Sequence, residues 1–119
     1  MNLPEMIEQM KQHPNISKAG MVLYHNGVVR ATSREGEKVT GLTIKVDHER
    51  LEEILTQAKA RPGIVEVLVH IEEDKDLAVG DDVMFLAVAG DIRENVIDTL
   101  SHTLNRIKAE VTAKTQFFV

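Results

Sequence analysis

The stretch from Val83 to Lys108 constrains the fold of this chain more than any other. An apolar run ends at a Gly-Asp pair, and a long amphipathic segment follows directly. Apolar residues at successive positions of the run predict a central β-strand that is covered on both faces. Apolar residues at helical spacing in the second part predict a helix that packs one face on a core. This apolar stripe consists of Ile92, Val96, Ile97, Leu100, Leu104 and Ile107. The segment therefore predicts a strand, a tight turn and a long helix in succession.

This helix carries one cation near each end, Arg93 in its first turn and Lys108 in its last. Both lie close to strand ends, where sites are often built. The fifteen residue steps from one to the other rise roughly 22 Å along a helix axis, so the two side chains of one chain cannot share a site. If both serve one site, a second subunit must complete it.

The other elements follow from apolar periodicity and turn residues. We expect helices at residues 3–12 and 48–60, and strands at 19–31, 39–46, 64–71 and 111–119. Asn26-Gly27 indicates either a hairpin turn or a bulge in one long strand. Asp91 and Glu94 have the spacing of a capping box. The pattern predicts an α+β fold with a mixed or mainly antiparallel sheet, a long C-terminal helix and a terminal strand, in a single domain spanning residues 1–119.

Composition excludes several classes of function. The net charge of −5 argues against nucleic-acid binding, and the absence of cysteine removes disulfides and thiolate chemistry. The five histidines lack metal-ligand spacing, so we expect no metal site and no cofactor. No segment approaches the length of a membrane span, and the N-terminus does not resemble a signal peptide. We therefore expect a cytoplasmic protein that does not contact membranes.

Four cations are candidates for binding an anion. Arg30 ends an apolar strand and is either a solvated arginine or an anion contact. The charge of Arg93 is unfavourable beside the positive end of the helix dipole, which favours a functional role for this arginine. Alternatively, Asp91 and Glu94 could simply pair with it. Lys108 suits the dipole at the helix C-terminus, so it is either a stabilising charge or an amine for proton transfer. Lys114, on the terminal strand, is a second amine near the same end.

Several segments together resemble the catalytic (large) subunit of molybdopterin synthase. They cover most of residues 19–111 and occur in the family's order: AGMVLYHNGVVR (19–30), GEKVTGLTIKV (36–46), LAVGDDVMFLAVAGDIRENVI (77–97) and LNRIKAEV (104–111). Gly27, Val29 and Arg30 match a Gly-x-Val-Arg pattern, Arg93 matches an arginine at a helix start, and Lys108 matches the catalytic lysine.

The resemblance implies a hammerhead-like α/β fold and a homodimer within a heterotetramer. The partner would be a ubiquitin-like small sulfur carrier whose C-terminal Gly-Gly ends in a thiocarboxylate. Sulfur would pass twice to cyclic pyranopterin monophosphate (precursor Z), forming the dithiolene of molybdopterin. Lys108 and Lys114 would be catalytic, and Arg30 and Arg93 would bind the anionic substrate, with Arg93 supplied by the other subunit.

Two departures from the family pattern keep an alternative open. The family has His-Arg at the helix start, where this chain has Ile92-Arg93. The family also has Pro-x-Trp-Lys after the catalytic lysine, where this chain has Val-Thr-Ala-Lys and Lys114 falls one position early. The alternative function is a non-catalytic homodimeric module that kept the fold and binds a small anion or a regulatory partner.

Overall fold

The computed structural model describes residues 1–119 and contains two three-stranded antiparallel sheets. The first sheet has the strand order β1-β5-β3, and the second has the order β4-β2-β6. The elements are α1 (Leu3–Lys11), a short 3-10 helix η1 (Ile16–Lys18), β1 (Met21–Val28), β2 (Val39–Val46), α2 (His48–Lys59), β3 (Ile64–Ile71), β4 (Leu77–Ala78), β5 (Asp82–Gly90), α3 (Arg93–Glu110) and β6 (Thr112–Phe118).

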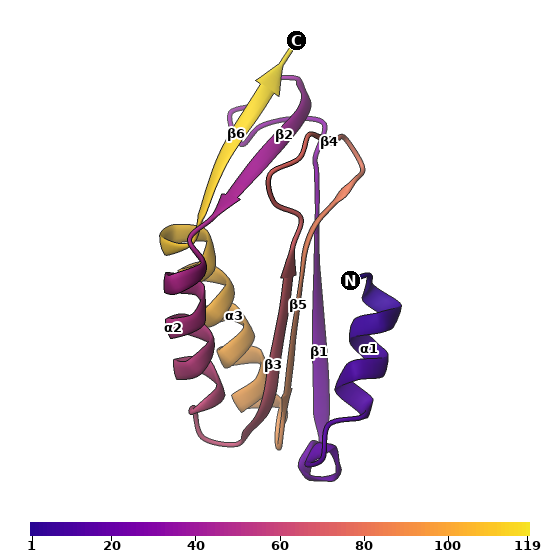
Figure 1. Ribbon diagram of the computed structural model, residues 1–119, viewed down its shortest axis with the longest axis vertical. Coiled ribbons are helices and arrows are strands. Elements are labelled where there is room, and N and C mark those ends of the chain that lie inside the picture. The colour runs from indigo at the N-terminus through magenta and orange to yellow at the C-terminus, as the bar shows by residue number, and fades with distance from the viewer.

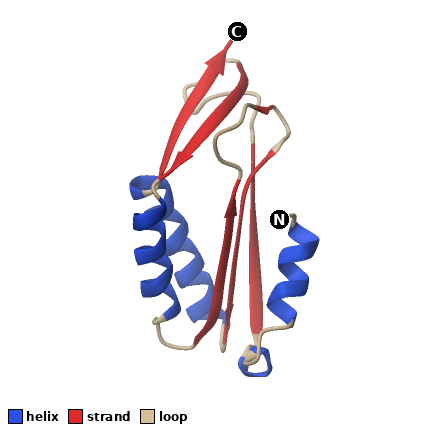
Figure 2. Ribbon diagram, in the orientation of Figure 1, coloured by secondary structure: helices blue, strands red, loops and turns tan.

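The first sheet is covered on both faces (Figure 1). Helices α2 and α3 pack on one face, and α1 packs on the other. The second sheet stands beyond the ends of α2 and α3, and it carries the C-terminus away from the helices (Figure 2). This arrangement gives the molecule an elongated shape of 48 × 26 × 24 Å.

Strand β5 is the central strand of the first sheet, and its side chains alternate between two cores. Met84, Leu86 and Val88 belong to the larger cluster under α2 and α3. Phe85 and Ala87, with Ala89, belong to the smaller cluster under α1. Because successive side chains of a strand point to opposite faces, an apolar run of this kind can be buried on both sides. The prediction of a central covered strand is confirmed.

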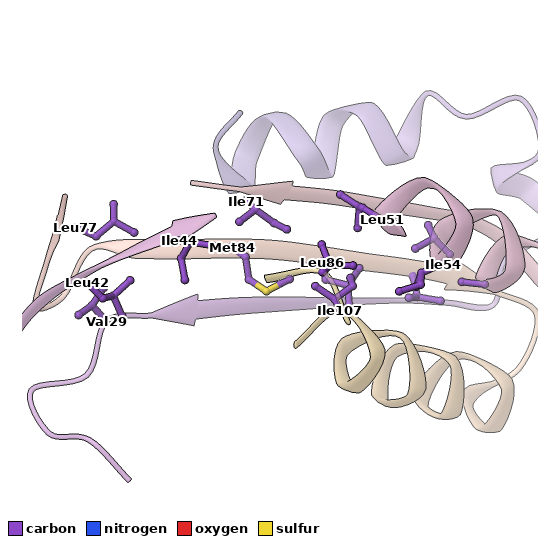
Figure 3. Close-up of a cluster of buried hydrophobic side chains, with 14 of the residues drawn as sticks. Val29, Leu42, Ile44, Leu51, Ile54, Ile71, Leu77, Met84, Leu86 and Ile107 are labelled. Carbon is purple, nitrogen blue, oxygen red and sulfur yellow. The ribbon is translucent and has the colours of Figure 1, made fainter. Parts of the chain in front are cut away.

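The larger core cluster also joins the two sheets (Figure 3). Leu42 and Ile44 of β2 are 6% and 4% exposed and lie in the same cluster as Met84 of β5. Ile107 of α3 is fully buried in it. The second sheet is therefore held to the first by shared apolar packing.

The predicted α+β fold with mainly antiparallel pairing is confirmed, and the structure decides between the two alternatives for Asn26-Gly27. Strand β1 runs through Asn26-Gly27 without a hairpin, and its register against β5 shifts between Gly27 and Val28. This shift is the bulge alternative. The antiparallel strands divide into two separate sheets, whereas the sequence indicated only one sheet with mixed or mainly antiparallel pairing.

The start of α3 differs from the predicted capping box. The N-cap residue is Ile92, whose side chain makes no capping hydrogen bond. Asp91 lies one position earlier and accepts hydrogen bonds from the Ile92 N–H at 2.7 Å and from Asn95 Nδ2 at 2.9 Å. Asp91 therefore anchors the turn before the helix, and Glu94 takes no part in a capping box.

The buried stripe of α3 also differs from the predicted one. Ile92 and Ile97 are 53% and 43% exposed, although both were expected to face the core. Thr99 and Thr103 are each 1% exposed and face α2 instead. The helix therefore packs against two elements, the sheet and α2, and its buried surface is wider and more polar than the apolar stripe indicated.

Candidate active site

Lys108 lies in the last turn of α3, where the helix crosses the first sheet near β1. Its side chain is exposed and forms no ion pair in the structure. Its positive charge is the second of two causes, after burial, that lower the pKa of His25 on β1. The ammonium is therefore free to meet an anion at the junction of helix and sheet.

His25 is the residue of this site that the sequence analysis did not single out. It shares a strand face with Leu23, which packs on the larger core, and with Gly27. A Cβ at Gly27 would lie 3.4 Å from His25 Nε2, so the ring lies beside this glycine. His25 Nε2 is buried and has no hydrogen-bond partner. The available signal was a histidine at an inward position of an apolar strand.

Burial is the main cause of the lowered His25 pKa, and the charge of Lys108 is the second. Both effects favour the neutral imidazole. A neutral ring has one nitrogen that accepts a proton or a hydrogen bond. The charge of Lys108 therefore acts on an imidazole whose Nε2 is buried and has no hydrogen-bond partner.

Arg30 follows β1 on the chain and is exposed. Its Nε donates a hydrogen bond to the Thr32 carbonyl at 2.8 Å, and it has no carboxylate partner. The preceding residue, Val29, is 2% exposed and anchors this turn in the core. The guanidinium is therefore held near the backbone with its terminal amino groups open to solvent.

Lys114 lies on β6 opposite Ile44 of β2. Paired residues of antiparallel strands project to the same face, so the Lys114 side chain leaves the sheet on the side where Ile44 packs into the core. Its own side chain is exposed, and β6 is an edge strand of this sheet. Lys114 therefore lies on the core-facing side of the second sheet, beyond the end of α3.

Arg93 is the first residue of α3, and its side chain is 75% exposed. Its one carboxylate neighbour is Glu94, with Arg93 Nε 3.7 Å from Glu94 Oε1. Helix α3 runs unbroken from Arg93 to Glu110, so Arg93 and Lys108 of one chain are at opposite ends. No hydrogen bond or ion pair joins any two of the four predicted cations.

Ile92 and Ile97 lie next to Arg93 on the exposed side of the first turns of α3. Two large apolar side chains about half exposed, beside a cation, form a small apolar patch with a charged edge.

No group of three or more histidine, aspartate or glutamate side chains is placed to hold a metal ion. No helix of the structure has the length and apolar character to cross a membrane.

Solved structures of similar fold come from molybdopterin synthesis. The molybdopterin synthase of Staphylococcus aureus superposes with a TM-score of 0.80 at 19% identity, covering 100% of this chain and 86% of that chain. The molybdopterin biosynthesis MoaE protein of Burkholderia ambifaria gives a TM-score of 0.78 at 18% identity, covering 100% and 82%. A complex of subunits 1 and 2 of the Helicobacter pylori molybdopterin-converting factor gives 0.75 at 16% identity, covering 99% and 80%. The fold is that of this class of proteins.

The sequence comparisons agree with the fold. The family model described as MoaE protein matches residues 2–110. The chain therefore belongs to the MoaE family, the family of the molybdopterin synthase large subunit. A probable molybdopterin synthase of Haloferax volcanii is 28% identical, over 92% of this chain and 43% of that protein. The chain thus spans less than half the length of this relative. The matched range includes Arg30, Arg93 and Lys108 and ends before Lys114.

Proposed function

We propose that this chain is the large subunit of a molybdopterin synthase and acts as one domain over residues 1–119. It would transfer sulfur from the thiocarboxylate of a small carrier protein to precursor Z. The observation that carries the proposal is the family match over residues 2–110, which includes an unpaired Lys108 at the end of α3. The charge of this lysine also acts on His25 of the first sheet.

The net chemistry in each round is the exchange of one oxygen for one sulfur. The carrier gives up its thiocarboxylate sulfur and keeps a carboxylate, while a substrate carbon loses oxygen and gains sulfur. No oxidant or reductant is required, because the oxygen ends on the carrier. The step needs a proton for the leaving oxygen and a cation beside the developing charge. We assign both tasks to Lys108, and Lys114 supplies a second positive charge on the core-facing side of β2 and β6.

Substrate binding would fall to the two arginines. Precursor Z carries a cyclic phosphate, and a guanidinium offers paired donors to phosphate oxygens. Arg30 is held near the backbone by its bond to the Thr32 carbonyl, which leaves its terminal amino groups for the anion. Arg93 of the same chain is too far away, since α3 separates it from Lys108. We therefore propose that Arg93 comes from a second copy of the chain.

A homodimer is supported by the surface around Arg93. Ile92 and Ile97 expose about half of their side chains beside it. Apolar side chains of this size favour burial against another subunit, and closed two-fold dimers are the commonest assembly of like subunits. A contact through this patch would carry Arg93 to the partner. With one carrier for each site, the assembly would be a heterotetramer.

The test is turnover of precursor Z with thiocarboxylated carrier, measured as dithiolene product. We expect Lys108→Ala to lose at least about a hundredfold in rate, the usual contribution of a positioned acid or base. Circular dichroism and sedimentation would show that the variant folds and assembles as the wild type does. Product formation at the wild-type rate would exclude this role for Lys108.

The second candidate function is a non-catalytic homodimeric module that binds a small anion or a regulatory partner. The feature that favours it is Ile92, an exposed apolar residue where the catalytic family has histidine. Native mass spectrometry with the cognate carrier separates the two candidates. A complex at micromolar concentration supports the synthase, and the absence of a complex supports the module.

A further inference from the structure

A polar pocket lies between α2 and α3, apart from Lys108. It has a volume of about 190 Å³ and a polar lining of Gln57 and Arg61 from the α2 side and of His102, Thr103 and Arg106 from α3. No carboxylate lines it. The volume is below the range of roughly 300–1,000 Å³ that drug-sized ligands occupy, so the pocket suits a small ion or one end of a larger molecule.

Arg61 is the first cation of this pocket. Its Nε donates a hydrogen bond to Thr99 Oγ1 at 3.0 Å, which fixes the plane of the guanidinium. It forms no ion pair with any carboxylate in the structure. Its two terminal amino groups have no partner among the protein atoms. A fixed guanidinium with free donors is well suited to an oxyanion.

Arg106 is the second cation. Its Nε donates to Glu110 Oε2 at 2.9 Å, and its Nη1 donates to Gln57 Oε1 at 2.5 Å. These bonds orient the guanidinium at the pocket wall and leave Nη2 without a protein partner. Glu110 also binds Arg50, and Arg50 has a second carboxylate partner in Glu53. The two carboxylates thus balance these two arginines, and the unpaired positive charge is that of Arg61. The pocket therefore keeps an excess of positive charge.

Thr103 provides an independent observation, a buried hydroxyl in the pocket lining that lacks a hydrogen-bond partner. This residue is 1% exposed, lines the pocket, and its hydroxyl has no hydrogen-bond partner. A buried hydroxyl without a partner costs about 1–3 kcal/mol relative to a satisfied one. An anion in the pocket would accept that hydroxyl hydrogen and remove the cost. The neighbouring Thr99 hydroxyl, by contrast, is already bonded to Arg61.

We propose that this pocket binds a small tetrahedral oxyanion of the phosphate class, either free or as the terminal phosphoryl group of a larger molecule. Arg61 and Arg106 bind its oxygens from two sides, and the Thr103 hydroxyl donates from the floor. Thr103 and Lys108 are separated by roughly 140° around α3, so the pocket is on a different side of the helix from the proposed catalytic lysine. It is a separate site and does not depend on the proposed function.

The experiment is a titration of the full chain with inorganic phosphate at constant ionic strength, followed by amide NMR shifts. We expect saturable shifts in α2 and α3 around Arg61 and Thr103. Arg61→Gln should weaken binding by about tenfold or more, since a bond to a charged group contributes roughly 1.5–3 kcal/mol. Arg34→Gln is the matched control, because Arg34 is an exposed loop arginine outside the pocket, and it should bind as the wild type does.

Thr103→Val separates ligand binding from a structural role. It replaces a buried, unpartnered hydroxyl with a methyl of similar shape, so the melting temperature should stay the same or rise. Phosphate binding should weaken several-fold in the same variant. Stability maintained and binding reduced is a combination that a purely structural threonine would not give.

Methyl phosphate distinguishes the two sources of the anion. Binding as tight as that of inorganic phosphate identifies a terminal phosphoryl group as a ligand, and binding more than about tenfold weaker identifies the free ion; both support the pocket. Three results would overturn it: no saturable shift, unchanged binding in Arg61→Gln and Thr103→Val, or loss of binding in Lys108→Ala. The last result would place the anion at the Lys108 site.

Discussion

His25 shows how one residue connects the fold to the proposed chemistry. Its position on β1 turns the ring toward the core side of the sheet, and burial lowers its pKa. Its Nε2 has no partner, and the nearest charge that affects its pKa is Lys108. The sequence placed His25 in a strand, but it could not show which helix residue would lie over it.

The coupling between these two residues gives a direct test. Replacing Lys108 with Met removes one of the two causes that lower the His25 pKa, so this pKa should rise. It should stay below the ordinary value of about 6.5, because burial remains. Titration of the His25 ring protons by NMR measures it. An unchanged His25 pKa in Lys108→Met would show that the two side chains do not interact.

Val88 tests the packing of the central strand. It is fully buried in the larger core, so Val88→Ala should lower the free energy of unfolding by about 1.5–3 kcal/mol. Val79 is 43% exposed, and the same substitution there should stay within about 0.5 kcal/mol. Urea denaturation of both variants gives the comparison. Equal losses at the two positions would contradict the assignment of β5 as the covered strand.

Among the elements, α2 and α3 are tied together by one carboxylate. Glu110 at the end of α3 binds Arg106 of its own helix and Arg50 of α2. The bonds to Arg106 and then to Arg50 lower the Glu110 pKa from 4.5 to about 2. Because the folded-state pKa lies below the unfolded one, this contribution to stability is present above pH 4.5 and is lost as the pH falls towards 2.

The pH dependence of the melting temperature of a Glu110→Gln variant measures how much these ion pairs stabilise the fold. At pH 7 the variant should melt at a lower temperature than the wild type, because Arg50 and Arg106 lose their shared partner. The difference should shrink as the pH falls from 4.5 towards 2, where the wild-type carboxyl becomes protonated. Melting curves across this range check it. A difference that is constant with pH would mean that the charge of Glu110 does not stabilise the helix pair.

The elements themselves could be predicted well from local patterns. The strands β2 and β3 and the Asp47-capped start of α2 lie where apolar alternation and turn residues indicated. The division into two sheets could not be predicted, since it depends on β6 pairing with β2 across a long stretch of sequence. The apolar stripe of α3 was misjudged at Ile92 and Ile97 for a related reason. Periodicity shows that a helix has an apolar face, and only the tertiary structure shows which part of it is covered.

For the whole molecule, the exposed patch of Ile92 and Ile97 is the feature that favours assembly. Replacing both residues with Ser should weaken the proposed homodimer without unfolding the chain, because both side chains are about half exposed. Sedimentation velocity over a range of concentrations should show more monomer in the double variant. A wild-type distribution would mean that the subunits meet through another surface.

The candidate site could be predicted only in part from the sequence. Arg30, Arg93 and Lys108 were identified by their positions at element ends and by resemblance, and all three lie within the matched family range. His25 and the pocket of Arg61 and Thr103 were missed, because their roles come from burial and from contacts between distant segments. Burial of a polar atom is a property of the folded chain and leaves no local pattern.

The most direct test of the central claim is subunit complementation. Lys108→Ala and Arg93→Ala chains, each inactive alone, are mixed, exchanged and assayed for dithiolene formation with thiocarboxylated carrier. If each site uses Lys108 of one chain and Arg93 of the other, every mixed dimer contains one intact site, and activity should return to roughly a quarter of the wild-type value. No recovery in a mixture shown to contain mixed dimers would contradict a site shared between two subunits.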